Sequence, residues 1–368
     1  MKIGFDATSV IHPVGGISRY AKNLLGAIVE LKNEDTVVGY IPVGARSQSE
    51  WSFDNYSDRV KWVEINPYTF RRRGAIDQLD LYHGTNFKLQ TSGRYGTVLT
   101  IHDLWLDRHP EYSKKLFGQR FSFFRTRRRV LEANRVIAVS HFTALEIQDL
   151  YGISQEKISV IHHGVSSDFF PDLDKSKFIK LIQKYGLPTG PYILFLGGAD
   201  PRKNHKTLFQ SFAHHTHLSR TYNLIAVGSL ESRGENLLQT SNSLGLKGKI
   251  YPVSTVSHEE LRLLYSFAEV FVYPSRYEGF GFPVLEAMAC GTPVITNKST
   301  SLPEVVGDAA ILVDAEDESA LGESMLKVLE DPLLCETLKR KGLAHSQGFS
   351  WMKAAQKTLN VYREVCQG

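Results

Sequence analysis

Short apolar runs alternate with longer amphipathic stretches along the chain, and the first half shows this alternation clearly. The order predicts an α/β protein with parallel sheets, because parallel strands are buried on both faces and are connected through helices. In the stretch 17–31 the apolar residues recur at the i, i+3 and i+4 spacing of a helix with one buried face. The expected strands cover 2–7, 36–42, 60–65, 79–82, 97–101, 135–139 and 158–162, and the expected helices cover 17–31, 114–133 and 141–151.

The pattern starts again at residues 192–196, an apolar run that ends in Gly197 and Gly198. The alternation that follows predicts a second α/β domain of the same kind. Its expected strands cover 192–196, 222–227, 249–253, 269–273, 293–296 and 311–313. Its expected helices cover 204–217, 233–244, 257–267, 283–290, 318–330 and 333–346, and a last amphipathic stretch covers 350–366.

A polar segment, 170–177, separates the two series of elements. With 368 residues, the chain is long enough for two domains that each bury a full core. We therefore predict a first domain at 1–170, a second at 171–349 and a final helix at 350–368.

The composition is that of an ordinary globular protein, with 42% apolar and 22% charged residues. Cys290, Cys335 and Cys366 have neither metal-binding nor redox spacing, which favours a reducing compartment. The first six residues are typical of a strand and not of a signal peptide. Since no apolar run has the length needed to cross a bilayer, we expect a cytoplasmic protein.

The positive charge is concentrated in the first half of the chain. Residues 1–168 contain 22 lysines and arginines against 18 aspartates and glutamates, whereas residues 169–368 contain 21 of each kind. The excess lies in Arg71-Arg72-Arg73 and in Arg125-Thr-Arg127-Arg128-Arg129. Such clusters favour peripheral contact with an anionic membrane or with a phosphate-bearing acceptor, although a solvated helix face and a basic loop explain them equally well. No aromatic-basic module points to nucleic acid as a partner.

Two carboxylates flank a glycine-rich turn in Glu278-Gly-Phe-Gly-Phe-Pro-Val-Leu-Glu286. Pro283 suits the first helical position, so the free amides around Gly281 and Phe282 are expected to face an anion. Glu286 is then close enough to accept hydrogen bonds from two neighbouring hydroxyls, and Glu278 reaches a second hydroxylated group. An anion with a diol on each side describes a nucleoside diphosphate sugar. The plain alternative is a surface helix with an acidic first turn.

Further candidate residues follow expected strands, where open parallel sheets bind their ligands. Arg202 and Lys203 offer fixed positive charge to a phosphate, although an exposed basic turn is the alternative. His102 follows the strand 97–101 and is a sugar-binding candidate, with a core histidine bonded to a carbonyl as the alternative. The glycine pair Gly15-Gly16 lets backbone amides approach a phosphate closely.

Taken together, these segments resemble the retaining glycosyltransferases of family 4. The resemblance implies the GT-B fold, with two facing Rossmann-like domains, parallel sheets and a C-terminal helix that crosses back to the first domain. Further similar segments are Ala138-Val-Ser-His-Phe-Thr143, Ile161-His-His-Gly-Val165, Tyr273-Pro-Ser-Arg-Tyr277 and Ser301-Leu-Pro-Glu-Val-Val-Gly307. The chain departs from the pattern at Gly198, where many relatives have arginine, and at His163, where asparagine is commoner.

The resemblance also implies roles for the candidate residues. Arg202 and Lys203 would neutralise the donor diphosphate, the Gly15-Gly16 pair would touch its β-phosphate, and His102 would face the donor sugar. We assign Glu278, His102, Arg202 and Lys203 to catalysis. We assign donor binding to Gly15, Gly16, Val253, Ser254, Phe280, Gly281, Phe282, Leu285 and Glu286, with Val253 and Ser254 as nucleobase contacts.

The expected reaction is metal-independent transfer of a hexose, with retention, from a nucleotide sugar to a glycan or lipid-linked glycan. Neither a metal nor a cofactor is expected, because Asp172-Leu-Asp174 lies in the expected linker. GDP-mannose is the first donor that the resemblance suggests, for synthesis of a surface polysaccharide on the inner face of the membrane. A GT-B sugar-nucleotide epimerase and a catalytically inactive glycan-binding or scaffold protein are the alternatives.

Overall fold

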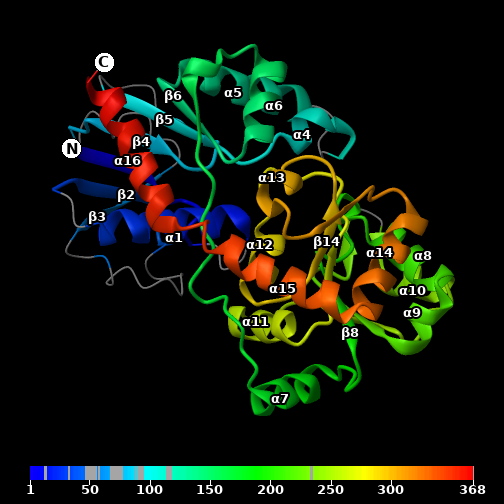
Figure 1. Cartoon of the computed structure of the whole chain (residues 1–368). Coiled ribbons are helices and arrows are strands. Elements are labelled where there is room, and N and C mark those ends of the chain that lie inside the picture. The colour runs from blue at the N-terminus through cyan, green and yellow to red at the C-terminus, as the bar shows by residue number, and fades with distance from the viewer. Residues whose placement is uncertain are drawn as a thin grey trace. The chain divides into compact units, whose positions relative to one another are not determined.

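The computed structural model describes the chain except for residues 12–14, 32–33, 46–55, 57–58, 67–77, 88, 90–94, 113–117, 233–234 and 368 and the side chains of 118–122. The expected basic loop Arg71-Arg72-Arg73 therefore lies outside the described residues. The chain forms two compact units, which are both visible in Figure 1. Unit 1 combines Met1–Gly164 with Ser350–Gly368, and unit 2 is Val165–Phe349.

Unit 1 is built on a sheet that has seven parallel strands among the described residues, in the order β3-β2-β1-β4-β5-β6-β7. The strand order changes direction between β1 and β4, and ligands of such sheets bind beyond the carboxyl ends of the strands at this point. The strands are β1 (Lys2–Asp6), β2 (Thr36–Pro42), β3 (Val60–Ile65), β4 (Leu81–Gly84), β5 (Gly96–Ile101), β6 (Arg135–Ala138) and β7 (Ile158–Val160).

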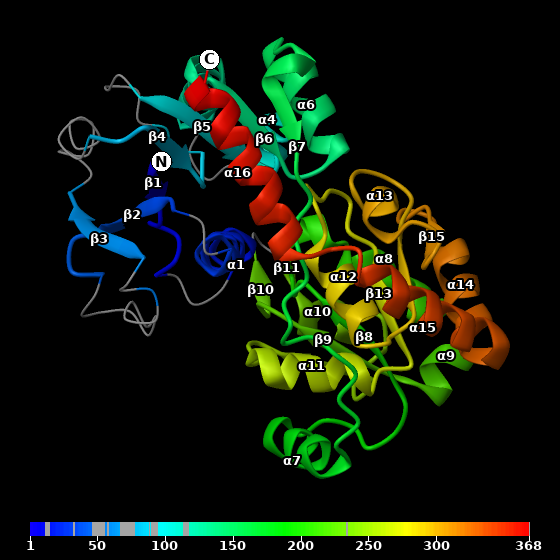
Figure 2. The same ribbon diagram turned by 60° about the vertical axis from the view of Figure 1, so that its left-hand side comes forward.

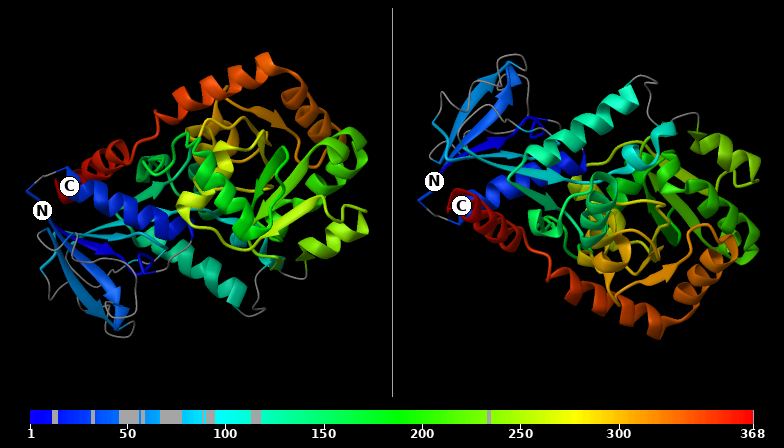
Figure 3. Two further views of the ribbon diagram at one scale, coloured as in Figure 1. Left: turned by 90° about the horizontal axis from the view of Figure 1, so that it is seen from below. Right: turned by 90° about the horizontal axis from the view of Figure 1, so that it is seen from above.

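Helices cover the sheet of unit 1, and the last helix of the chain is one of them. They are α1 (Gly16–Glu30), α4 (Trp105–Arg108), α5 (Gly118–Glu132), α6 (His141–Tyr151) and α16 (Trp351–Gln367), with 3-10 turns η3 (Pro110–Tyr112) and η4 (Gln155–Lys157). In α1 the predicted stripe, which includes Tyr20, Leu24 and Ile28, is buried. Figures 2 and 3 show α16 beside α1, and α16 also packs on β4 and β5.

Unit 2 has a sheet of six parallel strands among its described residues, in the order β12-β9-β8-β13-β14-β15. Its strands are β8 (Tyr192–Leu196), β9 (Asn223–Val227), β12 (Ile250–Val253), β13 (Val270–Tyr273), β14 (Val294–Asn297) and β15 (Ile311–Val313), beside a hairpin of β10 (Glu231–Ser232) and β11 (Glu235–Asn236). Its helices are α7 (Lys175–Tyr185), η5 (Pro201–Lys203), α8 (His205–His214), α9 (Thr216–Thr221), α10 (Leu237–Ser243), α11 (His258–Ser266), α12 (Phe282–Ala289), α13 (Leu302–Val306), α14 (Glu318–Glu330) and α15 (Pro332–Ser346).

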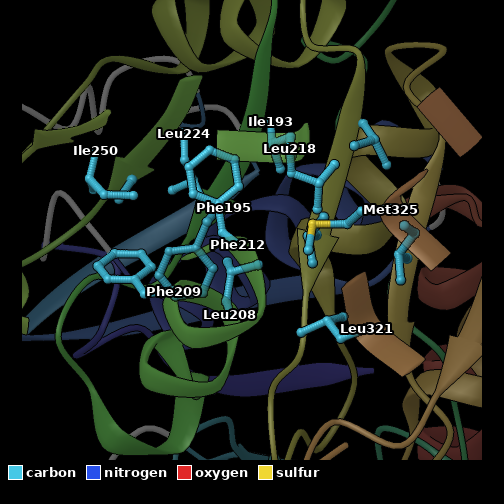
Figure 4. Packing of buried hydrophobic residues seen from close by; sticks show 14 of the residues in the cluster. Ile193, Phe195, Leu208, Phe209, Phe212, Leu218, Leu224, Ile250, Leu321 and Met325 are labelled. Atoms are coloured by element: carbon cyan, nitrogen blue, oxygen red, sulfur yellow. The ribbon is translucent and has the colours of Figure 1, made fainter. Parts of the chain in front are cut away.

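The core of unit 2 lies between its sheet and α8, α10 and α14 (Figure 4). Phe195 on β8 and Leu224 on β9 meet Phe209 and Phe212 of α8, and all four side chains are fully buried. Met325 of α14 closes the cluster from the other side. This packing holds the carboxyl ends of the strands, and the loops after them, in fixed positions.

The fold is the predicted one, with parallel α/β architecture in both units, but several elements differ from expectation. The helix expected at 204–217 is broken at His215, whose ring lies so close to Gly322 that a β-carbon there would be 2.1 Å from it. The helix expected at 233–244 begins at Leu237, where Asn236 caps it by accepting a hydrogen bond from the Gln239 amide.

Helix α7 was not predicted, because its polar sequence is typical of a linker. Asp174 caps α7 by accepting from the amides of Ser176 and Lys177, and Leu181 is its one buried residue.

Unit 2 begins at Val165, earlier than the expected boundary at 170. The reason is that the guanidinium of Arg262 on α11 donates to Asp172 over 2.9 Å and to the Asp168 carbonyl over 3.0 Å, which fixes this segment to unit 2.

Candidate active site

The centre of the candidate site in unit 2 is the carboxylate of Glu278, which lies in the loop between β13 and α12. Its Oε1 accepts hydrogen bonds from Lys203 Nζ over 2.5 Å, from Ser275 Oγ over 2.6 Å and from the Tyr273 hydroxyl over 2.8 Å. The other oxygen, Oε2, lies 3.8 Å from the Arg202 guanidinium. The structure thus brings together three predicted residues, Glu278, Lys203 and Arg202.

Glu278 is held in its charged form although it is only 7% exposed. Burial raises the pKa of this carboxyl, but Lys203, Arg202 and the Ser275 hydroxyl outweigh burial and lower its pKa from an ordinary value of 4.5 to about 2. Hydrogen bonds of this kind favour the ionised form. Oε1 has a structural part in this cluster, because it accepts from three donors.

The two loops that carry these residues are tied to each other through the backbone. The Arg276 amide donates to the Arg202 carbonyl over 2.8 Å, and the Arg276 guanidinium donates to the Pro201 carbonyl over 2.9 Å. Asp200 caps the 3-10 turn by accepting from the Arg202 amide, and Asn204 ends the turn in a left-handed conformation with φ 59°. A backbone hydrogen bond, the Arg276 guanidinium and the Asp200 carboxylate therefore hold the backbone of Arg202 and Lys203 in place.

Two glycines allow the loop after β8 to approach its neighbours. Gly198 has φ 60°, and a β-carbon there would lie 2.3 Å from the Ser229 carbonyl oxygen. At Gly197, with φ 142°, a β-carbon would lie 2.4 Å from Cγ of Lys203. Both the positive φ and the lack of space therefore favour glycine at position 198.

Helix α12 begins beside Glu278, as the sequence predicted. Gly281 precedes the helix with φ 112°, and Pro283 occupies its first turn. A β-carbon at Gly281 would lie 2.9 Å from Leu302 of α13, so both the conformation and the space require glycine. The first amides of a helix are suited to bind an anion, since the helix dipole is positive there.

The remaining donor-binding candidates of unit 2 lie around α12 and β12. Glu286 is 2% exposed, Leu285 is fully buried and Phe280 is 4% exposed, so Leu285 and Phe280 support the turn from the core side. Phe282 is half-buried. At the end of β12, Val253 is buried and Ser254 is exposed.

The structure adds residues that the sequence reasoning did not select. Ser301 donates to the carbonyls of Glu278 and Phe280 over 2.9 and 2.8 Å, and Tyr273 and Ser275 bind the Glu278 carboxylate. The signal was available, because Tyr273-Pro-Ser-Arg-Tyr277 and the Ser301 segment are two of the similar segments. Their side-chain roles depend on how the loop folds back, which sequence spacing does not show.

Unit 1 carries the predicted glycine pair and His102. Gly15, with φ 131°, precedes α1, and both Gly15 and Gly16 are exposed at the start of this 15-residue helix. Residues 12–14 of the same loop lie outside the described part of the chain. The exposed start of α1 is suited to an anionic group.

His102 follows β5 and is 8% exposed. Its Nε2 lies 2.8 Å from the Thr85 carbonyl oxygen, and because a carbonyl only accepts, Nε2 carries the proton. This bond is the feature expected of a structural histidine, yet it leaves Nδ1 as an acceptor. Burial lowers the pKa of His102, so the ring is neutral near pH 7. A neutral acceptor suits a sugar hydroxyl better than a phosphate.

The carboxylates of the Asp172-Leu-Asp174 segment have structural partners. Asp172 pairs with Arg262 and Asp174 caps α7. Asp103 accepts from the Trp105 amide over 3.2 Å. In the described part of the chain, no helix combines the length and apolar character that a membrane crossing requires.

Comparisons with known proteins cover nearly the whole chain. Residues 14–169 match the model described as Glycosyltransferase Family 4, and residues 177–345 match the model described as Glycosyl transferases group 1. O-antigen chain mannosyltransferase B of Escherichia coli is 32% identical, over 99% of this chain and 100% of that protein. O-antigen chain mannosyltransferase RfbU of Salmonella typhimurium is 35% identical, over 63% of this chain and 60% of that protein.

Solved structures with the same fold cover both units. Sucrose-phosphate synthase of Thermosynechococcus elongatus gives a TM-score of 0.79 at 21% identity, over 99% of each chain. HepE of Anabaena in complex with UDP-glucose gives a TM-score of 0.77 at 19% identity, over 99% of this chain and 100% of that one. The chain therefore belongs to glycosyltransferase family 4 and has the GT-B fold.

Proposed function

We propose that this glycosyltransferase moves a hexose, with retention and without a metal, from a nucleotide sugar to a hydroxyl of a glycan or lipid-linked glycan. The Glu278 cluster is the observation that carries the proposal. It offers a buried carboxylate, an ammonium that is partly shielded from water and a guanidinium beside the start of α12, beyond the carboxyl ends of a parallel sheet. Nucleotide ligands of open parallel sheets bind at such edges.

The cations of the cluster are assigned to the donor diphosphate. An ammonium has three N–H bonds, and Lys203 uses two of them for Glu278 and Tyr273. The third N–H of Lys203, the Arg202 guanidinium and the amides of Gly281 and Phe282 would hold the phosphates. In unit 1, the amides of Gly15 and Gly16 would add to this phosphate binding.

The carboxylates are assigned to hydroxyl groups of the donor. Oε2 of Glu278 would accept from hydroxyls of the sugar, and Glu286 would accept from the ribose hydroxyls. Val253 and Ser254 would contact the nucleobase, with Phe280 and Leu285 supporting the binding turn. Nδ1 of His102 would accept from a sugar hydroxyl and help to orient the ring.

The reaction that fits this arrangement breaks the bond between the anomeric carbon and the phosphate oxygen. The acceptor oxygen forms its bond on the face that the phosphate leaves, and the acceptor proton passes to the departing phosphate. Preorganised cations would stabilise the developing phosphate charge, an effect typically worth ~3–4 kcal/mol for each well-placed donor. The assigned residues supply this electrostatic stabilisation, so neither a metal nor a covalent glycosyl-enzyme intermediate is required.

The relatives suggest the substrate class. Two of them are O-antigen chain mannosyltransferases, which supports mannose as the transferred sugar, GDP-mannose as the first donor to test and a surface polysaccharide as the product. An acceptor on a lipid carrier would place the protein on the inner face of the membrane. Helix α5 is suited to this contact, since Phe124 and Leu131 are 61% and 45% exposed beside the exposed Arg127 and Arg128.

Calorimetric titration with GDP-mannose, GDP, UDP-glucose, UDP-N-acetylglucosamine and a dTDP-sugar, in the presence of EDTA, tests the donor site. Product analysis by NMR then reports whether the anomeric configuration of the donor is kept. Binding of one nucleotide class, transfer to a mannose-containing acceptor and retention are the expected results. An epimerised donor without acceptor would indicate the epimerase, and donor binding without turnover across acceptors would indicate a scaffold protein.

A further inference from the structure

A chain of buried polar side chains crosses unit 1 from the last helix to the first. The Tyr362 hydroxyl on α16 lies 2.5 Å from Nδ1 of His83 on β4, and Nε2 of His83 lies 2.7 Å from Oγ1 of Thr100 on β5. The same Oγ1 lies 2.9 Å from the hydroxyl of Tyr20 on α1. All four residues are buried, with exposed fractions of 0–3%.

The hydrogen bonds of this chain depend on one another. Burial, and to a lesser degree the nearby His102, lower the pKa of His83 to about 3, so its ring is neutral and carries a single N–H. If that proton is on Nε2, His83 donates to Thr100 and Tyr362 donates to His83; if it is on Nδ1, His83 donates to Tyr362, Thr100 donates to His83 and Tyr20 donates to Thr100. Loss of the Tyr362 or the Thr100 hydroxyl therefore leaves a buried nitrogen of His83 without that partner.

This hydrogen-bonded series of side chains ends at Tyr20, which lies against His102, the candidate sugar-binding histidine. The Tyr20 ring meets the His102 ring at 78° with a centroid distance of 4.7 Å, and it lies 4.9 Å from the His163 ring. Edge-to-face contact of this kind restricts rotation of both rings. The hydrogen bond from His102 to the Thr85 carbonyl holds one nitrogen, and the Tyr20 ring holds the flank of the imidazole.

We propose that Tyr362, His83, Thr100 and Tyr20 are positioning residues, which hold the His102 imidazole in the orientation that the donor sugar requires. The inference rests on the proposed function, in which Nδ1 of His102 accepts from a sugar hydroxyl. It makes α16 a part of the catalytic scaffold, acting through Tyr362, in addition to its packing on α1 and the sheet.

Tyr362→Phe removes the hydroxyl at one end of the hydrogen-bonded series and keeps the aromatic ring. Tyr192→Phe is the matched control, because the buried Tyr192 hydroxyl donates to the Leu264 carbonyl over 2.7 Å in unit 2. We expect Tyr362→Phe to lower kcat about tenfold with little change in donor KM, since small displacements near the reacting centre are costly. Tyr192→Phe should leave both constants unchanged. Equal kinetic effects of the two variants would overturn the proposal.

Nitrogen-15 NMR of the histidine rings gives a readout that does not depend on turnover. In the intact protein His102 should show a single tautomer with the proton on Nε2, and Tyr362→Phe should shift or broaden its signals. Thr100→Val interrupts the chain at its centre and should have the same effect, while Tyr192→Phe should leave the signals in place. Unchanged His102 signals in both chain variants would contradict the proposal.

A double-mutant cycle separates positioning from general stability. In a His102→Ala background, Tyr362→Phe should cause no further loss of kcat, although its effect on the unfolding midpoint should remain. A tenfold loss that persists without His102 would show that Tyr362 acts by another route. If no donor is turned over but the His102 signals still respond to Tyr362→Phe, the proposed function fails and the coupling between Tyr362 and His102 stands.

Discussion

Nζ of Lys203 lies 2.5 Å from Oε1 of Glu278, although 75 positions separate these residues in the sequence. The two side chains are only 13% and 9% exposed, so each neutralises a charge that water reaches poorly. Such a pair is costly to break from one side, because the remaining partner stays charged in a buried position. The same pair is also the centre of the proposed phosphate and sugar site. A variant that removes both charges should therefore lose activity while it keeps much of its stability.

Lys203→Met should lower the free energy of unfolding by about 3 kcal/mol, because it leaves the Glu278 carboxylate uncompensated. The double variant Lys203→Met/Glu278→Gln should recover much of this loss, since neither charge remains. Transfer activity should stay low in both variants. Urea denaturation measures the stability of both variants, and donor kinetics measures their transfer activity. A Lys203→Met variant as stable as the wild type would contradict the expected loss of stability.

Acid should destabilise the protein through Glu278 in a defined window. The folded-state pKa of this carboxyl is about 2 and its ordinary value is 4.5, so its contribution is complete above pH 4.5 and is lost as the pH falls towards 2. The contribution at neutral pH is ~3 kcal/mol. Urea midpoints measured between pH 3 and 6 should fall more steeply for the wild type than for Glu278→Gln. Parallel profiles would show that Glu278 is not the group responsible.

Glu286→Gln should weaken nucleotide binding about tenfold or more, because hydrogen bonds to a charged group contribute ~1.5–3 kcal/mol. Calorimetric titration with the nucleotide that the wild type binds measures this effect. Glu323→Gln is the control, since Glu323 lies exposed on α14 in the same unit. An unchanged dissociation constant for Glu286→Gln would remove Glu286 from the ribose site.

Gly281→Ala should destabilise unit 2 and weaken donor binding. Gly245 supplies the matched control, because it also has positive φ, 71° against 112°, but a β-carbon there meets no atom within 4 Å. Gly245→Ala should cost ~1 kcal/mol of backbone strain, and Gly281→Ala should cost ~2–3 kcal/mol because its β-carbon also meets Leu302. Thermal unfolding of both variants tests this order, and equal losses would argue that the contact with Leu302 relaxes freely.

Phe124→Ser should reduce binding to vesicles that contain anionic phosphatidylglycerol, because it removes an exposed aromatic group beside the arginines of α5. Leu333→Ser is the control, since Leu333 is 82% exposed but lies on α15 in unit 2. Vesicle flotation with neutral and anionic lipids gives the comparison. Equal binding by the wild type and Phe124→Ser would exclude this part of α5 as the contact.

The sequence predicted the parallel α/β architecture because strand burial and helix periodicity are local signals. The stripe of α1 appears where its residues indicate, and α12 begins at Phe282, one residue before the predicted start at Pro283. Helix α7 was missed because it buries only Leu181, so its composition is that of a polar connection. The break at His215 depends on close approach to Gly322, a contact over 107 positions that no local pattern contains.

The candidate site was predictable as far as motif residues are concerned. Glu278, Lys203 and Arg202 were selected from their segments, and the structure places them within one cluster. The hydroxyls of Tyr273 and Ser275 were not selected, since their part in the cluster depends on the loop turning back onto Glu278. The hydrogen-bonded series from Tyr362 to Tyr20 could not be predicted from the sequence either, because its members come from four separate elements.

Helix α16 completes unit 1 although unit 2 lies between them in the sequence, which bears on the order of events during translation. At about 5–20 residues per second, a ribosome needs roughly 10–40 s to synthesise Val165–Phe349. Throughout that time His83 lacks Tyr362, and the part of the sheet that α16 covers stays open to chaperones. Of the two units, the continuous unit 2 is therefore the first to have all its residues, and unit 1 is completed after it.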